Sequence, residues 1–169
     1  MNRNSIPVIF LFLFITGFAK AQATISAQAF AEVIEALAAS EDEPLNFGRF
    51  TTGSNGGAVI ISPDGLRSVR GTVTPAGGMY SPGRFVVTGS PGASFTITLP
   101  GEETILVHQQ SGNTMQVNGW LSDPPSGDAA NLSDGSRMVS IGATLNIGSM
   151  EENPAGIYAG TFVLTFAYN

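Results

Sequence analysis

The chain has 169 residues, a single histidine, no cysteine, and seven basic against thirteen acidic residues, which gives a formal net charge of −6. This length fits one domain with a core of its own. The absence of cysteine excludes disulfides, thiolate metal sites and lipid attachment at a cysteine, and one histidine excludes a metal site built from several histidines of one chain. The acidic balance argues against nucleic-acid binding, which requires a basic face.

The first residues have the pattern of a cleaved secretory signal peptide. Arg3 supplies a positive charge, and residues 8–18 form an apolar stretch that is shorter than the ~20 residues of a membrane span. We assign residues 1–21 to the signal peptide, with cleavage after Ala21 or Ala23. Cleavage leaves five arginines, no lysine and a net charge of −8. We expect an exported protein in the periplasm, at the cell surface or outside the cell, with no integral membrane span after cleavage.

Residues 22–44 form an N-terminal segment with two interpretations. Its larger apolar residues recur at helical spacing in an alanine-rich stretch, which favours an amphipathic helix; they are Phe30, Val33, Ile34 and Leu37. Apolar residues of one parity also fit an extended strand, which would be a first strand of the domain or a donor strand for a partner; its candidate residues are Ile25, Ala27, Ala29 and Val33.

From residue 45 onward, apolar and polar residues alternate in short runs separated by Gly, Pro, Asn, Ser and Asp. This pattern predicts antiparallel strands that have one face in a core and the other in water. The expected strands are 45–50, 58–62, 67–73, 83–89, 94–99, 104–109, 115–121, 138–147 and 160–168. The polar region 123–137 is expected to be a long surface loop. The prediction is therefore an all-β domain over residues 45–169, built as an antiparallel β-sandwich.

The residues with catalytic potential give no constellation. His108 lies between Val107 and Gln109 in an expected strand, where we expect it to face solvent. The acid pairs Glu102–Glu103 and Glu151–Glu152 lie in turn-like sequence, where exposed carboxylates keep ordinary pKa values. We therefore expect no enzymatic activity.

Binding-site motifs are equally few, and we expect no cofactor and no metal. Asp123, Asp128 and Asp134 could supply oxygen ligands to calcium, but their spacing does not match an EF-hand. Trp120 could stack on a sugar, although its neighbourhood in an alternating strand favours packing in the core.

The C-terminus has a distinctive arrangement. Gly156 is fourteenth from the end and Tyr168 is penultimate, and one face of the last strand carries Phe162, Leu164, Phe166 and Tyr168. This arrangement resembles the C-terminal β-zipper of chaperone–usher pilus subunits. That resemblance implies an assembly strand beside an open hydrophobic groove, which a strand from a chaperone or from the next subunit would fill.

Over the whole mature chain the sequence resembles the bacterial domain-of-unknown-function family 4402. The resemblance is carried by residues 23–25, 34–37, 45–48, 85–92, 95–100, 141–145 and 156–168. It implies export and an immunoglobulin-like, pilin-like β-sandwich, in which the region before Leu45 is extended. The cysteine pair frequent in other chaperone–usher subunits is absent.

Two functions follow as expectations. The first is a fimbria-like surface subunit that associates with itself or with a periplasmic chaperone by strand addition, with the N-terminal segment as donor and a groove beside residues 160–168 as acceptor. The alternative is a monomeric binding module that recognises a glycan or a protein through loops such as 74–83 and 122–137.

Overall fold

The computed structural model describes residues 25–169, so the predicted signal peptide and its cleavage sites lie outside the described residues. The chain divides after Glu32 into two units, of which the second, Val33–Asn169, carries all the strands. Residues 25–37 contain neither helix nor strand, so the helical interpretation of this segment is wrong. Within residues 25–169 there is no helix of the length and apolarity that crossing a bilayer requires.

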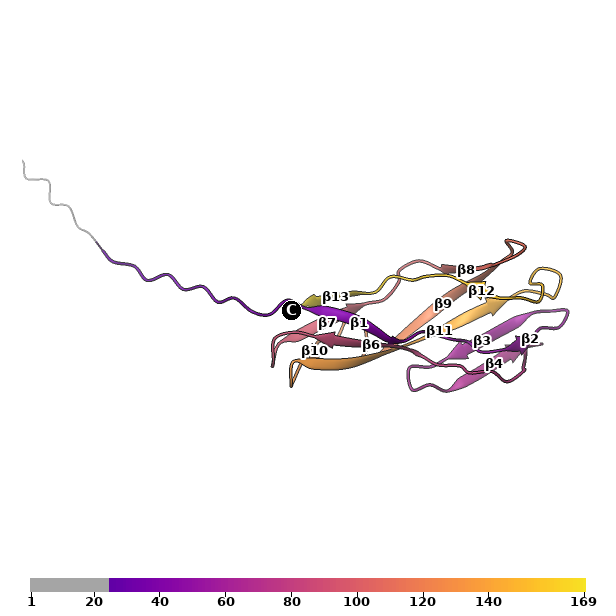
Figure 1. Ribbon diagram of the computed structural model, residues 1–169, viewed down its shortest axis with the longest axis horizontal. Helices are drawn as coiled ribbons and strands as arrows, with labels where there is room; N and C mark the ends of the chain where they lie inside the picture. Colours follow the sequence, from indigo (N-terminus) through magenta and orange to yellow (C-terminus); the bar gives the residue numbers. More distant parts are fainter. Residues whose placement is uncertain (1–24) are drawn as a thin grey trace, which may run out of the picture. The chain divides into compact units, whose positions relative to one another are not determined.

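Every regular element of the described residues is a β-strand (Figure 1). In chain order they are β1 (Ala38–Glu43), β2 (Phe50–Thr51), β3 (Gly57–Ile61), β4 (Arg67–Gly71), β5 (Thr74–Pro75), β6 (Gly83–Thr88), β7 (Ser94–Thr98), β8 (Thr104–His108), β9 (Thr114–Asp123), β10 (Ala130–Asn131), β11 (Ser136–Ile147), β12 (Tyr158–Ala159) and β13 (Thr165–Tyr168). All strand pairs are antiparallel, as the alternation predicts.

The largest sheet has eight strands in the order β1-β6-β11-β9-β8-β12, and β3 and β4 extend it beside β11. Strand β11 organises this sheet, because one edge pairs first with β6 and then with β3 while the other edge pairs with β9. Gly142 lies where the partner changes, and a side chain there would collide with the Ile61 carbonyl. The smaller sheets are β10-β7-β13 and β2-β5.

The interior consists of two core clusters that lie along the large sheet. The first core cluster combines one half of that sheet with the strip of chain before β2; its buried residues are Phe47, Val59, Ile61, Val73, Met115, Val117, Ala143, Leu145 and Ile147. The second core cluster lies between the other half and the three-stranded sheet; its buried residues are Val87, Phe95, Ile97, Ala130, Leu132, Val139 and Ile141. Two antiparallel layers around the second core cluster are consistent with the predicted β-sandwich.

Three expected elements differ from the structure. The expected strand 45–50 is reduced to an isolated bridge between Asn46 and Ser81, followed by β2. The expected strand 160–168 is reduced to β13 at residues 165–168, since residues 160–164 form no strand. The expected loop 123–137 contains β10, and β9 and β11 extend into it from either side.

Candidate functional site

The C-terminal segment, residues 156–168, connects the two layers. Strand β12 pairs with β8 in the large sheet, and β13 pairs with β7 in the three-stranded sheet (Figure 1). The four residues proposed for the assembly strand all pack against the second core cluster and are half-buried, while the odd-numbered residues between them are exposed; the four are Phe162, Leu164, Phe166 and Tyr168. The predicted shared face therefore exists even where the backbone is not in a strand.

Aromatic contacts hold this segment over the core. The Phe162 ring lies 4.7 Å from the Trp120 ring and 6.3 Å from the Phe85 ring, measured between centroids. The Phe166 ring lies 6.2 Å from the Phe95 ring and 6.5 Å from the Phe85 ring. Trp120 packs against both core clusters, so it is a core residue rather than an exposed platform for a sugar.

The penultimate tyrosine fixes the start of the domain. Its hydroxyl accepts a hydrogen bond from the Ser90 N–H (2.8 Å) and donates one to the Glu35 carbonyl (2.9 Å). Gly89 makes room for this hydroxyl, because a side chain at that position would collide with it. Tyr168 thus ties the C-terminus to the chain just before β1.

Tyr168→Phe removes both hydrogen bonds and keeps the ring. We expect the free energy of unfolding to fall by about 1–3 kcal/mol, because the part-buried Ser90 N–H loses its partner. Urea denaturation measures the change. Tyr80→Phe is the matched control, with an expected change within about 0.5 kcal/mol for an exposed side chain; equal effects of the two substitutions would contradict the assigned role of Tyr168.

His108 is buried, with 5% of its surface exposed, so the prediction that it faces solvent is wrong. The inner face of β8 carries Leu106 and His108, whereas Ile105 and Val107 are exposed, because Leu106 pairs with Met115 over the first core cluster. The His108 Nδ1 atom accepts a hydrogen bond from the Ser111 N–H (3.0 Å).

Gly156 lies directly against this histidine. A Cβ atom at position 156 would overlap the His108 ring, and the centroid of this ring lies 4.9 Å from that of the Tyr158 ring. The glycine of the C-terminal pattern therefore has a local physical reason, namely close packing on a buried imidazole.

An open groove of about 840 Å³ lies over the first core cluster, at the start of the C-terminal segment. One wall is residues 44–52 and the other is residues 154–160. The walls and floor are mainly apolar, with half-buried side chains over buried ones; they include Leu45, Phe47, Phe50, Leu106, Met115, Leu145 and Tyr158. Residues of the three-stranded sheet belong to the second core cluster, whereas the first core cluster includes none of them.

This location differs from the expectation. The predicted acceptor groove lies beside residues 160–168, whereas the groove in the structure reaches only Gly160 and extends from there toward Pro154. The sequence predicted a strand at 45–50 but no functional site there, although Leu45 and Phe47 alternate with polar residues.

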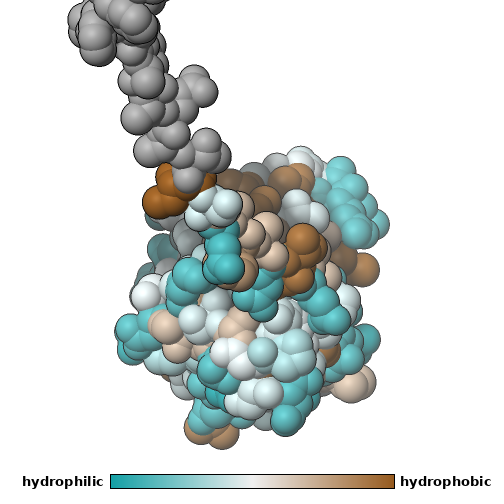
Figure 2. Space-filling model, turned by 90° about the vertical axis from the view of Figure 1, so that its left-hand side faces the viewer, coloured by the Kyte–Doolittle hydropathy of each residue, from teal (hydrophilic) through white to brown (hydrophobic). Residues whose placement is uncertain are grey.

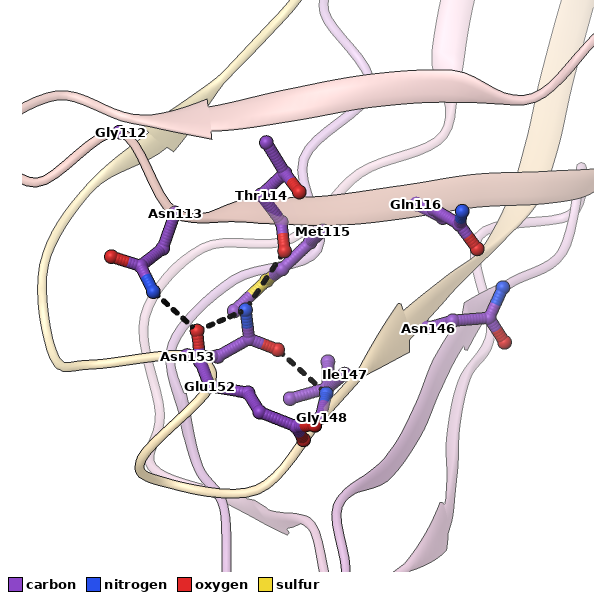
Figure 3. Close-up of a pocket in the computed structure, with 10 residues that line it drawn as sticks. All are labelled: Gly112, Asn113, Thr114, Met115, Gln116, Asn146, Ile147, Gly148, Glu152 and Asn153. Atoms are coloured by element: carbon purple, nitrogen blue, oxygen red, sulfur yellow. Dashed lines mark hydrogen bonds between the residues drawn. The ribbon is translucent and has the colours of Figure 1, made fainter.

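A buried amide, Asn153, holds the turn that leads into the groove wall at residues 154–160, and its hydrogen bonds are drawn in Figure 3. Asn153 is 6% exposed; its Oδ1 accepts a hydrogen bond from the Gly148 N–H (2.6 Å) and its Nδ2 donates to the Thr114 carbonyl (2.9 Å). Next to it the Asn113 side chain donates to the Glu152 carbonyl (2.8 Å). These bonds pin the turn after β11 to β9, so the shallow polar pocket in Figure 3 has a structural role.

The remaining candidate residues do not form a reactive site. Hydrogen bonds from the Ser149 backbone and hydroxyl hold the pKa of Glu152 below its usual 4.5, so this carboxylate departs from the ordinary value that we expected. Glu102, Glu103 and Glu151 are exposed. Within residues 25–169 no three acidic or histidine side chains gather as metal ligands, so Asp123, Asp128 and Asp134 are not brought together as a group.

The N-terminal segment, residues 25–36, is exposed at every position. Its larger apolar side chains stand out: Ile25 is 90%, Phe30 88% and Val33 96% exposed. The end view of the molecule is otherwise largely hydrophilic, with apolar side chains in separate groups (Figure 2). Leu37, the next residue, is half-buried against the second core cluster.

A comparison with protein families matches residues 37–168 to the "Domain of unknown function (DUF4402)". The chain belongs to the DUF4402 family. The matched region begins at Leu37 and includes every strand of residues 25–169, and the exposed residues 25–36 precede it. The comparisons with curated proteins and with solved structures give no match.

Proposed function

We propose that this DUF4402 protein is an exported, fimbria-like surface subunit with an immunoglobulin-like, pilin-like β-sandwich, and that it assembles by addition of a β-strand. The observation that carries the proposal is the exposed N-terminal segment. An apolar row with about nine-tenths of Ile25 and Val33 in water is unfavourable in a free chain, and an apolar surface of this kind marks an interaction site.

The segment has the chemistry of a donor strand. In an extended conformation Ile25, Ala27, Ala29 and Val33 lie on one face, and polar residues such as Ser26, Gln28 and Glu32 share the opposite face with Phe30 and Ile34. Strand addition uses main-chain hydrogen bonds for affinity and alternate side chains for specificity, so one apolar row is sufficient. A chaperone strand would use the same recognition mode.

A charge placed on this row tests the function. Ala29→Asp buries an unpaired carboxylate in the proposed interface, at a cost on the order of 3 kcal/mol, or about a hundredfold in affinity. We expect light scattering after size-exclusion chromatography to show loss of oligomers. Gln28→Asp adds the same charge on the opposite face and is the matched control, for which we expect assembly to be retained.

The result can also go against the proposal. If the unsubstituted protein stays monomeric at all concentrations and does not bind a donor peptide of residues 25–36, the strand-addition function is wrong. A monomer that binds a glycan or protein through loops 74–83 and 122–137 would establish the alternative function instead.

A further inference from the structure

We propose that the groove between residues 44–52 and 154–160 is the acceptor, and that its occupant is the N-terminal segment of a second copy of this chain. This inference rests on the strand-mediated assembly proposed above and adds the site to it. It moves the acceptor away from the β13 edge, where the sequence pattern had placed it, to the other end of the C-terminal segment.

Both walls of the groove present a free backbone edge. Strand β12 ends the order of the large sheet, so among the described residues only its edge toward β8 is paired. On the opposite wall the hydrogen bonds run to one side only: Asn46 pairs with Ser81, and Arg49 bonds to residues 76–77. Unpaired backbone groups along such an edge are the template to which an added strand binds.

The floor supplies the apolar contacts that an added strand needs. Leu106 and Met115 are directly opposite each other on β8 and β9, and Leu145 lies on the neighbouring strand β11. Leu106 is only half-buried, as are Leu45 and Tyr158 on the walls. A row of small and medium apolar side chains, such as Ala27, Ala29 and Val33 of the N-terminal segment, would cover these surfaces.

The charges of groove and segment are complementary. The single charged side chain that lines the groove is Arg49, a cation. Within residues 25–36 of the segment, the charged residues are Glu32 and Glu35, both anions. On an extended strand Glu32 has the parity opposite to the apolar row, so it would lie at the rim of the groove, where Arg49 is exposed.

The segment of the same chain is poorly placed to fill the groove. The chain is fixed at Glu35 by the Tyr168 hydroxyl and at Leu37 by the second core cluster. From there β1 leads to the groove over six residues, about 20 Å at ~3.3 Å per residue. The segment would have to reverse direction at residues 33–37, which include no glycine, proline or asparagine for a tight turn. A second copy is free of this constraint.

Cross-linking tests the site directly, because the chain has no cysteine of its own. One full-length chain carries Ala29→Cys, and a differently tagged chain carries Ile157→Cys on the groove wall. A short bis-maleimide linker is used because it can join the two thiols even if positions 29 and 157 are not directly opposite each other in the bound strand. Binding raises the local thiol concentration to the order of millimolar, so we expect roughly tenfold more mixed covalent dimer than with Leu66→Cys as the remote partner. Ile157 and Leu66 are matched at 66% and 68% exposed.

Each other outcome decides the inference. Preferential linkage to Val163→Cys, which is 76% exposed near β13, overturns the groove assignment and leaves strand-mediated assembly standing. If the protein assembles but Ala29→Cys links equally to Ile157→Cys, Val163→Cys and Leu66→Cys, the groove assignment is likewise wrong and strand-mediated assembly stands. A chain with both Ala29→Cys and Ile157→Cys that links internally at high dilution assigns the groove to its own segment. A protein that neither links nor assembles overturns both proposals.

Discussion

Gly156→Ala is expected to lower the free energy of unfolding by about 3 kcal/mol, the upper part of the usual range for overpacking. The added methyl group overlaps the His108 ring, and the ring has little room to move because Tyr158 packs on it and Ser111 bonds its Nδ1 atom. Domains have a total stability of about 5–15 kcal/mol, so a substantial fraction is lost. Chemical denaturation measures the loss.

Two further variants make this prediction specific. Gly101→Ala is the matched control, since a methyl group there meets no atom within 4 Å; we expect a change within about 0.5 kcal/mol. In the double variant Gly156→Ala/His108→Ala the clash is absent, and we expect an interaction energy of about 1–3 kcal/mol relative to the sum of the single changes. Strictly additive losses would show that the His108 contact is not the cause.

Asn153→Ala is expected to cost about 2 kcal/mol. Its amide makes three part-buried hydrogen bonds, and the two that connect it to Gly148 and Thr114 are worth about 1 kcal/mol each. The loss should be local as well as global, since the turn that Asn153 pins to β9 leads into the groove wall at residues 154–160. Amide hydrogen exchange should therefore increase in that wall before global unfolding.

The neighbouring amide is the control for this prediction. The Asn113 side chain accepts a hydrogen bond from the Ser111 hydroxyl and donates one to the Glu152 carbonyl; both are exposed, so Asn113→Ala should change stability by less than about 1 kcal/mol. If Asn113→Ala and Asn153→Ala have the same effect on stability and on exchange, burial of the Asn153 amide does not explain the rigidity of the wall.

Strands with a clear apolar alternation and turn residues at both ends were predictable. Expected strands 58–62, 83–89 and 94–99 agree with β3, β6 and β7 to within one residue at each end. Strand β1 could not be predicted, because its residues are small or charged and show no apolar alternation. It forms because it pairs with β6, whose Val87 lies opposite Ala39. Pairing with a neighbour, rather than propensity, determines such a strand.

Alternation reports which side chains face a core, and it does not report whether the backbone is paired. Residues 160–164 keep the alternation of the C-terminal segment, but they cross between two sheets and form no strand. The same distinction explains the candidate site. The apolar face of residues 162–168 is a local pattern and could be predicted. The groove could not, because it depends on the spatial separation of residues 44–52 from residues 154–160, which are about a hundred positions away in the chain.

The hydrogen bond from Tyr168 to the Glu35 carbonyl has a consequence for the order of folding. It joins the chain before β1 to Tyr168, 133 positions later, and β13 pairs with β7 only over residues 165–168. The second core cluster can therefore not be closed before β13 has paired with β7, and until then Phe95 lacks the Phe166 ring as its aromatic neighbour. Pairing of β13 is in this sense a late, non-local step in the closure of the domain.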